Sequence, residues 1–579
     1  MRRLAAAAAL LLPLWALGAD VPSPPVSRLG GFTPVWQAPA DGPGYGEDGD
    51  LPHLLHGASG DLLISSGEAS GEVVLREAAT GRVHTRLRMG RGQRLEQAGL
   101  AGDTVVAHRS EPGGAPSDVP VHRLSGHRAG SGGQLWSVDA SAVLERETGA
   151  RPEAVQTTVT AAGIVLGGTE SGALVGLRPG DGSTAWRAAV PGAALGGCER
   201  TMAAGPTALA VMLHCHGVTT VTALDPATGH PRWRRDVPGP GEDAPGEEPL
   251  DQGGWPRSLE VGADGTVLAS AGEVHEVYSP TGKRLVAAGR GQAYGLAVTE
   301  RGFVFQSQPD AWFPAEITTA VGRDGRIAWR RGLPAGRIHA VGRVRGPRLA
   351  VAGAPTGPPD GSMPAFLTVV DLDDGAFTQR PLPTYGLTST LIGTGAGLAL
   401  VHDGSPGGGR VTAYRLSPPS GIGAPELGGV APEAWPDACG LLRVTDLAVL
   451  RTGYSAHPRH RRIAGLPLPH PATCDFAPPL DGGAAVSLAV EWVAPSPAAA
   501  RSLVAGELAY RAHGVEDRRT SERRGEGVWQ IDGTGLAPRP DSALITAGGV
   551  VVRLRVFDDP EGVRRVAETV ARRLRETRG

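Results

Sequence analysis

A turn flanked by strands recurs along this sequence, and it constrains the fold more than any other feature. One copy, ALDPATGHPRW, runs from Ala223 to Trp233. Asp225 and Pro226 favour turn initiation, Gly229 supplies a residue that tolerates positive φ, and the closing Trp brings a ring large enough to pack into a core. The segment is therefore predicted to be a strand end, a tight turn and a returning strand.

Further copies of this hairpin are spread over most of the chain. They close at Leu87, Trp186, Leu285, Trp329 and Phe377, and a degenerate copy, QLW, ends at Trp136. Most copies follow one another at about 40 to 50 residues, and a period of this length made only of strands is typical of a propeller. We expect a mainly β fold with one four-stranded antiparallel blade per repeat, spanning residues 30–418.

The last repeat lacks a closing strand, whereas a strand-like segment around Trp36 has no strands before it. Because a propeller hides its edge strands by closing the ring, we expect Phe32–Ala40 to complete the blade begun at 389–416. This predicts eight blades, with seven as the alternative if the weak second repeat is an insertion. The other blades are expected at about 54–89, 97–138, 155–190, 203–237, 258–289, 294–333 and 338–382.

The character of the sequence changes after the propeller. Residues 419–436 are rich in Pro and Gly and are predicted to be a linker, and residues 437–579 are predicted to form a small α+β domain with an antiparallel sheet. Ser496 and Pro497 have the residue types of an N-cap and a first helical position. Helices are expected at 437–451, 496–514 and 560–577, strands at 474–479, 484–494, 527–533 and 542–556, and an exposed loop at 517–524.

The first 19 residues have the pattern of a secretory signal peptide. A short basic start is followed by the apolar run Leu4–Leu17 and by small residues before Asp20. The run is short for a membrane-spanning helix, so we expect cleavage, with retention as an anchor as the alternative. The mature protein is expected to be secreted or associated with the cell envelope.

Cysteine usage agrees with an oxidising compartment. The four cysteines are Cys198, Cys215, Cys439 and Cys474. Four cysteines allow three pairings, and we expect pairing within each region, Cys198 with Cys215 and Cys439 with Cys474. A metal site is the alternative for Cys215, because His214 and His216 flank it. In a strand, however, both His side chains point away from the Cys side, which argues against joint ligation.

Charge and motifs limit the classes of function. The net charge of −3 gives no global reason to expect a nucleic-acid partner. The sequence has no G-x-S-x-G, H-E-x-x-H or phosphate-loop pattern. Asp371, Asp373 and Asp374 lack the spacing of a calcium loop and are interpreted as a solvated turn. The acidic insert Pro238–Gly254 is likewise expected to be a solvated loop.

The repeated AL-D-x-x-TG-x-x-x-W pattern resembles the blade motif of the pyrroloquinoline-quinone-like (PQQ-like) propeller repeats, over about residues 30–420. That family includes quinoprotein dehydrogenases and non-enzymatic envelope proteins. Its blade Trp docks between neighbouring blades, so the resemblance implies structural roles for Trp136, Trp186, Trp233 and Trp329, and ring closure gives Trp36 the same role. The segments ACGLL, CDF and GLAPRPDSALI resemble small exported domains of unknown function.

The resemblance does not transfer catalysis to this chain. Quinoprotein dehydrogenases stack the quinone on adjacent cysteines and use Asn beside a calcium ion; here no two cysteines are adjacent and the sequence contains no Asn. We expect no catalytic, cofactor-binding or metal-ligating residue. The predicted function is non-catalytic binding or scaffolding, as a monomer, toward an envelope protein or polymer. The alternatives are a quinone- or metal-dependent oxidoreductase and a carbohydrate-binding or carbohydrate-processing propeller.

Overall fold

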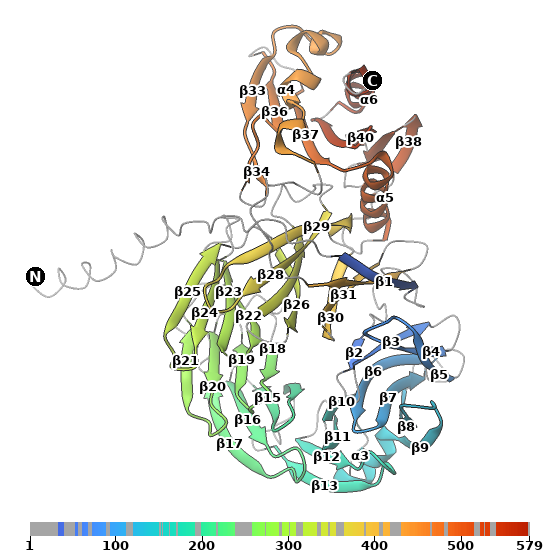
Figure 1. Ribbon diagram of the computed structural model, residues 1–579, viewed down its shortest axis with the longest axis vertical. Helices are drawn as coiled ribbons and strands as arrows, with labels where there is room; N and C mark the ends of the chain where they lie inside the picture. The colour runs from blue at the N-terminus through green and yellow to red at the C-terminus, as the bar shows by residue number, and fades with distance from the viewer. Residues whose placement is uncertain are drawn as a thin grey trace, which may run out of the picture.

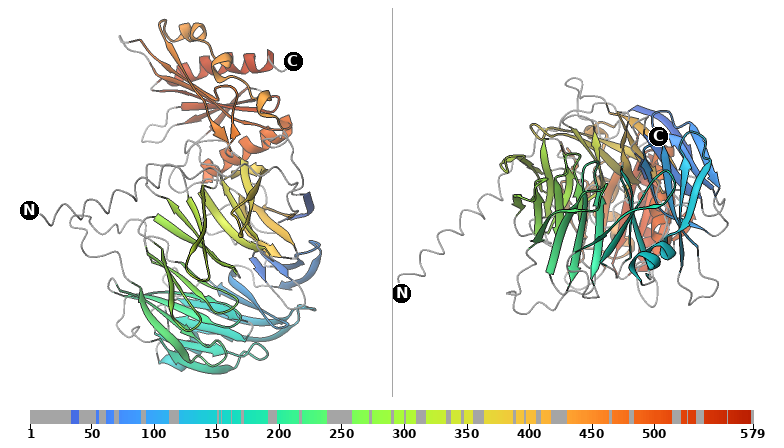
Figure 2. Two further views of the ribbon diagram at one scale, coloured as in Figure 1. Left: turned by 60° about the vertical axis from the view of Figure 1, so that its left-hand side comes forward. Right: turned by 90° about the horizontal axis from the view of Figure 1, so that it is seen from below.

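The computed structural model shows a ring of small sheets with a second domain beside it (Figures 1 and 2). It describes residues 33–39, 53–55, 61–67, 72–88, 93–111, 120–149, 152, 154–160, 162–168, 172–190, 198–215, 218–237, 258–271, 274–288, 292–299, 301–308, 317–332, 337–344, 348–354, 364–386, 389–395, 397–404, 409–416, 430–463, 466–479, 484–513, 521–525, 527–532, 540–557 and 559–576. The predicted signal peptide at 1–19 and the acidic insert lie outside the described residues.

Eight four-stranded antiparallel sheets occur among the described residues, and they succeed one another around the ring as propeller blades. The first four are β2 (His53–Leu55), β3 (Leu62–Gly67), β4 (Glu72–Glu77) and β5 (Val83–Arg88); β6 (Arg94–Ala101), β7 (Thr104–Glu111), β8 (Val121–Arg128) and β9 (Gln134–Asp139); β10 (Val155–Thr160), β11 (Gly163–Gly168), β12 (Ala173–Leu177) and β13 (Thr184–Ala189); and β14 (Glu199–Ala204), β15 (Leu209–Cys215), β16 (Val218–Leu224) and β17 (Pro231–Val237).

The remaining four sheets complete the ring. They are β18 (Ser258–Val261), β19 (Val267–Ala271), β20 (Val274–Tyr278) and β21 (Arg284–Ala288); β22 (Gln292–Val298), β23 (Gly302–Gln308), β24 (Ile317–Gly322) and β25 (Ile327–Gly332); β26 (Arg337–Val344), β27 (Arg348–Ala354), β28 (Pro364–Asp371) and β29 (Phe377–Tyr385); and β30 (Ser389–Gly395), β31 (Leu398–Asp403) and β32 (Arg410–Arg415) with β1 (Thr33–Pro39). A helix that the sequence analysis missed, α3 (Ala140–Thr148), follows the second blade.

The N-terminal strand closes the ring, as predicted. β1 pairs antiparallel with β32, with Gln37 opposite Thr412. Behind the seam, residues of the first and last blades form one apolar cluster, in which Leu63 and Ala78 meet Leu400 and Val411. The first and last segments of the propeller are therefore joined both by strand pairing and by a buried core.

Five indole rings each dock one blade onto the next, at five of the eight junctions between blades. Their Nε1–H groups donate to carbonyl oxygens in the following blade: Trp36 to Ala78 (3.1 Å), Trp136 to Pro179 (2.7 Å), Trp186 to Pro226 (3.2 Å), Trp233 to Pro280 (3.0 Å) and Trp329 to Leu372 (3.0 Å). Small residues make room for the rings within the same blade; Gly176 on β12, for example, lies opposite Trp186 on β13. The five tryptophans thus occupy the inter-blade positions expected of them.

The C-terminal domain is an α+β unit built on one antiparallel sheet. Its strands lie in the order β33 (Ser455–Arg459), β36 (Thr473–Ala477), β37 (Val486–Val493), β41 (Val550–Val556), β40 (Pro540–Ala547), β39 (Val528–Asp532) and β38 (Ser521–Gly525), with a separate pair β34 (Arg462–Ile463) and β35 (Leu466–Pro467). The helices are α4 (Ala438–Leu441), α5 (Pro497–His513), α6 (Pro560–Glu576) and the 3₁₀ segments η3 (Pro432–Ala434) and η4 (Val444–Val449).

Three expectations for this domain need correction. The helix expected at 437–451 is split into α4 and η4, because Leu442 is extended (φ −133°) and both it and Leu441 are buried. Part of the loop expected at 517–524 is strand β38, which pairs with β39 at the sheet edge. The end of the predicted linker is not a linker, since Trp435 is buried in the core of the domain.

The propeller and the C-terminal domain share one hydrophobic core. Phe366, on β28 of the seventh blade, packs edge-on against Trp492 of β37 with ring centroids 5.8 Å apart, and Trp492 packs on Trp435 at 5.3 Å. Beside these rings, helix α5 contacts β29, and the Tyr385 and Tyr510 rings lie 6.0 Å apart. Aromatic burial of this extent fixes the domain against the rim of the ring.

Candidate functional site

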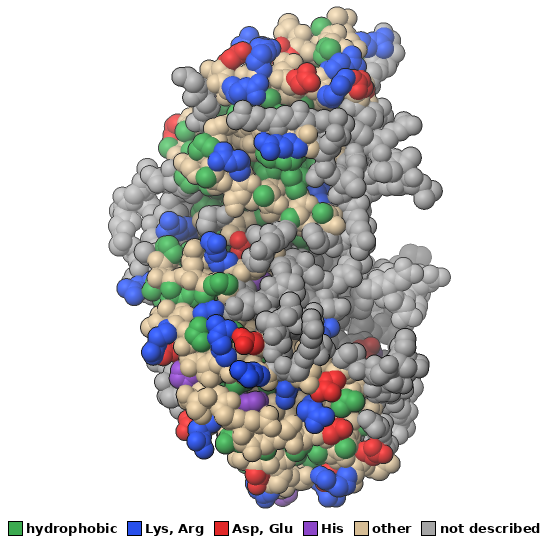
Figure 3. All heavy atoms as spheres, turned by 90° about the vertical axis from the view of Figure 1, so that its right-hand side faces the viewer, with side chains coloured by type: hydrophobic (Ala, Val, Ile, Leu, Met, Phe, Trp, Pro, Cys, Tyr) green, Lys and Arg blue, Asp and Glu red, His purple; other side chains and the backbone are tan. Residues whose placement is uncertain are grey.

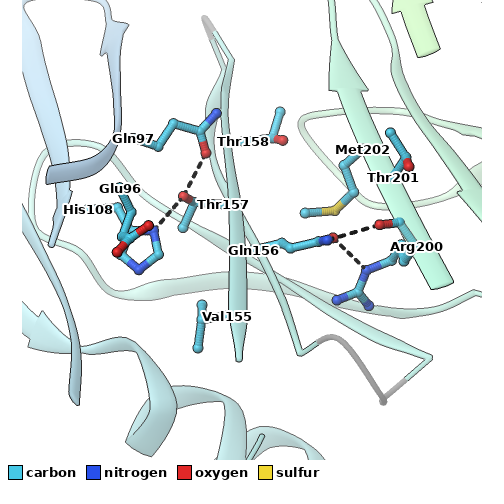
Figure 4. Close-up of a pocket in the computed structure, with 10 residues that line it drawn as sticks. All are labelled: Glu96, Gln97, His108, Val155, Gln156, Thr157, Thr158, Arg200, Thr201 and Met202. Carbon is cyan, nitrogen blue, oxygen red and sulfur yellow. Dashed lines mark hydrogen bonds between the residues drawn. The ribbon is translucent and has the colours of Figure 1, made fainter. Parts of the chain in front are cut away.

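A cavity lies where the first strands of three consecutive blades begin (Figure 4), and the first strands of the blades surround the central channel of the ring (Figure 1). Its volume is about 310 Å³. Residues 155–158 of β10 form its middle, residues 200–202 of β14 one side, and Glu96 and Gln97 of β6 with His108 of β7 the other. Most of the lining residues carry a hydroxyl, amide or charged group, while apolar and polar atoms contribute comparable shares of the lining surface, which suits a ligand that forms hydrogen bonds as well as apolar contacts.

A chain of hydrogen bonds runs from the cavity into the second blade. Thr157 Oγ1 donates to Gln97 Oε1 over 2.8 Å, so this hydroxyl accepts from His108 Nδ1–H at 3.0 Å. The other nitrogen of that ring, Nε2, then accepts from His122 Nδ1–H at 3.1 Å. Each group in this series of hydrogen bonds is therefore fixed as donor or acceptor at each bond, and the Gln97 amide oxygen accepts from Thr157.

The two histidines in this series of hydrogen bonds, His108 and His122, are neutral at neutral pH. Burial, with a contribution from the neighbouring His122 ring, lowers the pKa of His108 to about 3. Burial also lowers the pKa of His122. Neutral rings are what the hydrogen-bond chain requires, since His108 Nε2 must accept. The pair therefore acts as a fixed polar support for Gln97 and Thr157.

A second set of contacts ties the third blade to the fourth. Gln156 Nε2 donates to the carbonyl oxygen of Arg200 (2.9 Å), and Arg200 Nε donates to Gln156 Oε1 (3.3 Å). The guanidinium of Arg200 also donates to the carbonyl oxygen of Gly168. Burial lowers the pKa of Arg200 to about 10, so it remains a cation at neutral pH. Together the two sets of contacts hold β10 between β6 and β14.

None of the residues singled out from the sequence lines this cavity. The structure has the two expected disulfides, Cys198–Cys215 and Cys439–Cys474, and within the described ranges every cysteine is paired. His214 hydrogen-bonds Thr219 over 2.9 Å instead of turning toward its Cys neighbour. The cavity residues come from three different repeats, and no local motif marks them.

The cavity does not match the quinone site implied by the dehydrogenase members of the family. Its lining contains no cysteine, and in the part of the chain that the structure describes no group of three or more His, Cys, Asp or Glu residues could hold a metal ion. Charges on the described surface are mixed in sign: Figure 3 shows acidic and basic side chains interspersed on one face. Among the described helices, none is long and apolar enough to cross a membrane.

Fold and cavity together define a closed β-propeller with a polar pocket at its channel. Residues 33–207 match the family model described as outer membrane protein assembly factor BamB. The matched residues include β1 and the first three blades, so this part of the chain is similar to the family, and the sheets themselves show a closed β-propeller. None of the curated proteins compared with the sequence matches it.

Several solved structures are similar to this chain at low sequence identity. BamB from Moraxella catarrhalis is 16% identical, over 67% of this chain and 100% of its own, with a TM-score of 0.41. The quinohemoprotein alcohol dehydrogenase ADHIIG from Pseudomonas putida HK5 is 13% identical, over 68% and 78%, with a TM-score of 0.41. Sqt1 from Saccharomyces cerevisiae is 10% identical, over 65% and 98%, with a TM-score of 0.40.

Proposed function

We propose that this protein is a non-catalytic binding or scaffolding propeller that acts outside the cytoplasm, in association with the cell envelope. The observation that carries the proposal is the shared core of Phe366, Trp492 and Trp435, which joins propeller and C-terminal domain. Because one core spans both parts, they form a rigid body that can hold a partner against two surfaces in fixed geometry.

The chemistry of the channel cavity favours binding over acid–base catalysis. A general acid or base needs a pKa near the working pH. Burial lowers the pKa of His108 to about 3, and its ring is fixed between Thr157 and His122. At neutral pH these groups can position a ligand, whereas the proton that His108 holds on Nδ1 is committed to Thr157.

Two further features support the place of action and the kind of partner. Two disulfides and the predicted export signal favour an oxidising compartment outside the cytoplasm. The matching family model is described as an outer membrane protein assembly factor, and we assign this chain an envelope protein or polymer as partner by that likeness. We place the protein in solution as a monomer.

Affinity purification of the full chain from the cell envelope tests the scaffold, with bound species identified by mass spectrometry. Replacing Phe366 by Ala should release the partner while both parts keep their circular dichroism signals. Phe305→Ala removes an equally buried ring from the sixth blade and should leave partner binding unchanged. Equal partner recovery with Phe366→Ala would show that the rigid junction has no part in binding.

A second assay addresses the oxidoreductase alternative. Purified protein is incubated with pyrroloquinoline quinone and calcium, and dye reduction is followed with alcohols and sugars as substrates. We expect neither a stoichiometric quinone spectrum nor dye reduction. Calcium-dependent dye reduction by the reconstituted protein would replace the proposed function with a dehydrogenase.

A further inference from the structure

We propose that the channel cavity binds an extended polypeptide segment, which adds as a strand to the free edge of β10. The inference rests on the proposed binding function and adds the class of ligand that the channel cavity would bind. Four consecutive residues of β10, Val155 to Thr158, line the cavity. Side chains of consecutive strand residues point to opposite faces, so a cavity that touches all four lies against the edge of the strand.

The edge of β10 that faces the cavity is unpaired within the described part of the chain. β10 is the first strand of its sheet and pairs with β11 alone, Val155 to Gly168 through Thr160 to Gly163. Alternate backbone N–H and C=O groups of such a strand point away from its partner. Strand addition uses these groups for affinity and the flanking side chains for specificity.

The two neighbouring blades provide walls of the appropriate chemistry. On one side β6 has a bulge between Leu95 and Gln97, and the extra residue, Glu96, lines the cavity. Bulges of this kind re-aim side chains. The Gln97 amide oxygen accepts from Thr157, so its NH₂ group is left to donate elsewhere. On the other side Thr201 and Met202 of β14 line the cavity.

The charges at the cavity favour a neutral ligand that both donates and accepts. Glu96 would repel an anion, buried Arg200 would repel a cation, and an apolar ligand would cover the Gln97 amide without replacing its hydrogen bonds. A peptide main chain meets all three conditions. No Trp, Tyr or Phe is present in the described lining, which leaves a sugar ring without a stacking surface. The volume of about 310 Å³ suits a few residues of extended chain.

The test uses the full-length protein and a pool of capped eight-residue peptides of random sequence, each with one photo-reactive residue. Cross-linked sites are mapped by mass spectrometry, and the best binder is then made with single N-methylated amides. Strand addition predicts cross-links at residues 94–97, 155–158 and 200–202. It also predicts that N-methylation at every second position weakens binding at least tenfold, whereas methylation between those positions has little effect.

A pair of variants tests the walls. Gln97→Ala should weaken peptide binding by about tenfold, and Gln37→Ala, which removes an exposed amide from the outer strand β1, should leave it unchanged. Cross-links confined to other surfaces, a uniform effect of N-methylation, or displacement of the peptide by triacetylchitotriose would overturn the inference. The proposed function would survive any of these outcomes if the envelope partner still required Phe366; quinone-dependent dye reduction would overturn that function instead.

Discussion

The indole of Trp36 lies across the turn glycine of the first blade, so close that a Cβ added to Gly81 would come within 2.6 Å of the ring. One residue belongs to the first described strand, the other to the turn after β4, and β1 itself is part of the last blade. This contact is the seam of the ring. The same arrangement recurs between Trp136 and Gly182 and between Trp186 and Gly229.

Loss of the Trp36 ring should destabilise the whole propeller. The ring is half-buried, so Trp36→Ala should cost about 2–3 kcal/mol, below the 3–5 kcal/mol of fully buried aromatic truncations. Val35→Ala on the same strand is the control, because Val35 is exposed. Chemical unfolding measures both, and limited proteolysis reports whether the blades at the seam open. Equal stability of the two variants would show that the seam does not depend on this ring.

Turn glycines beneath an indole should tolerate Ala less well than turn glycines in open space. Gly229 has φ +71° and its added Cβ would meet the Trp186 ring at 2.4 Å, whereas Gly102 has φ +59° and no neighbour within 4 Å. Gly102→Ala should cost about 1 kcal/mol for the backbone conformation alone. Gly229→Ala should cost about 1–3 kcal/mol more, because the ring must move. Similar midpoints in denaturant would contradict the docking role of Trp186.

Removal of either disulfide should lower stability by an amount set by the loop that it closes. The bonded cysteines are separated by 17 residues in Cys198–Cys215 and by 35 in Cys439–Cys474. Chain entropy then predicts losses of about 3 and about 4 kcal/mol on replacement by Ser. Peptide mapping of the unreduced protein checks the pairing, and free thiols or a link between the two regions would refute it.

Stability should fall on acidification, partly through His108. The pKa of this buried ring is about 3 in the folded protein, whereas the ordinary value of 6.5 applies to the solvated ring in the unfolded chain. The unfolded state therefore takes up a proton first, so the contribution of His108 is complete above about pH 6.5 and is lost as the pH falls toward 3. The free energy of unfolding should depend less steeply on pH in His108→Gln than in the parent protein. Between pH 6 and 4 the slope should be lower by up to about 1.4 kcal/mol per pH unit.

Two other buried histidines also make the free energy of unfolding depend on pH. Burial lowers the pKa of His275 and of His402 to about 4, so a slope remains in the His108 variant. His230→Asn is the matched control, because that side chain is exposed. If both variants retain the slope of the parent protein, the His108 ring is not held neutral in the folded state.

The buried carboxyl of Glu491 should lower the stability of the folded protein as the pH rises. Its Oε1 accepts from Arg553 Nε at 3.2 Å, while Oε2 has no hydrogen-bond partner among the described residues. Burial raises the pKa of Glu491, so the folded state prefers the neutral acid and loses stability as the pH rises above the unfolded value of 4.5. Glu491→Gln should match the parent at pH 4 and exceed its unfolding midpoint at pH 8.

A matched change separates this effect from general loss of the ion cluster. Glu507 accepts from both Arg511 and Arg553, so Glu507→Gln removes the negative charge that faces two buried guanidinium groups. That variant should be less stable than the parent at pH 8. If Glu491→Gln is destabilised to the same extent, the carboxylate of Glu491 is needed in its charged form.

The repeating elements were predictable because their signals are local. The turn glycines and closing tryptophans predicted the hairpins, and the unpaired strand at Trp36 predicted ring closure. Helix α3 also had local signals that the repeat pattern overshadowed: Asp139 Oδ1 accepts from Ala142 N–H at 2.9 Å, and Gly149 ends the helix at φ +81°. The Pro497 helix was predicted from its cap, and Ala499 N–H donates to Ser496 Oγ at 3.2 Å.

The cavity and the domain junction were not predictable, because both depend on contacts between distant repeats. Thr157 and Gln97 are 60 residues apart in sequence, and each is an ordinary strand residue until the blades meet. The Pro- and Gly-rich sequence before Trp435 predicts a linker, yet this residue packs on Trp492. Composition describes a segment by itself, whereas burial is decided by what packs against it.

The seam also sets an order of events in folding. Arg410 donates to Gln37, and the two residues are 373 positions apart in the sequence. Pairs this remote form slowly, because loop-closure entropy is lost before the contact forms. The other seven blades can each form from strands that are consecutive in sequence, whereas β1 can pair only after β32 has formed. The ring should therefore close last, and until then the emerging polypeptide exposes one unpaired β1 segment to any chaperone or competing strand that it meets.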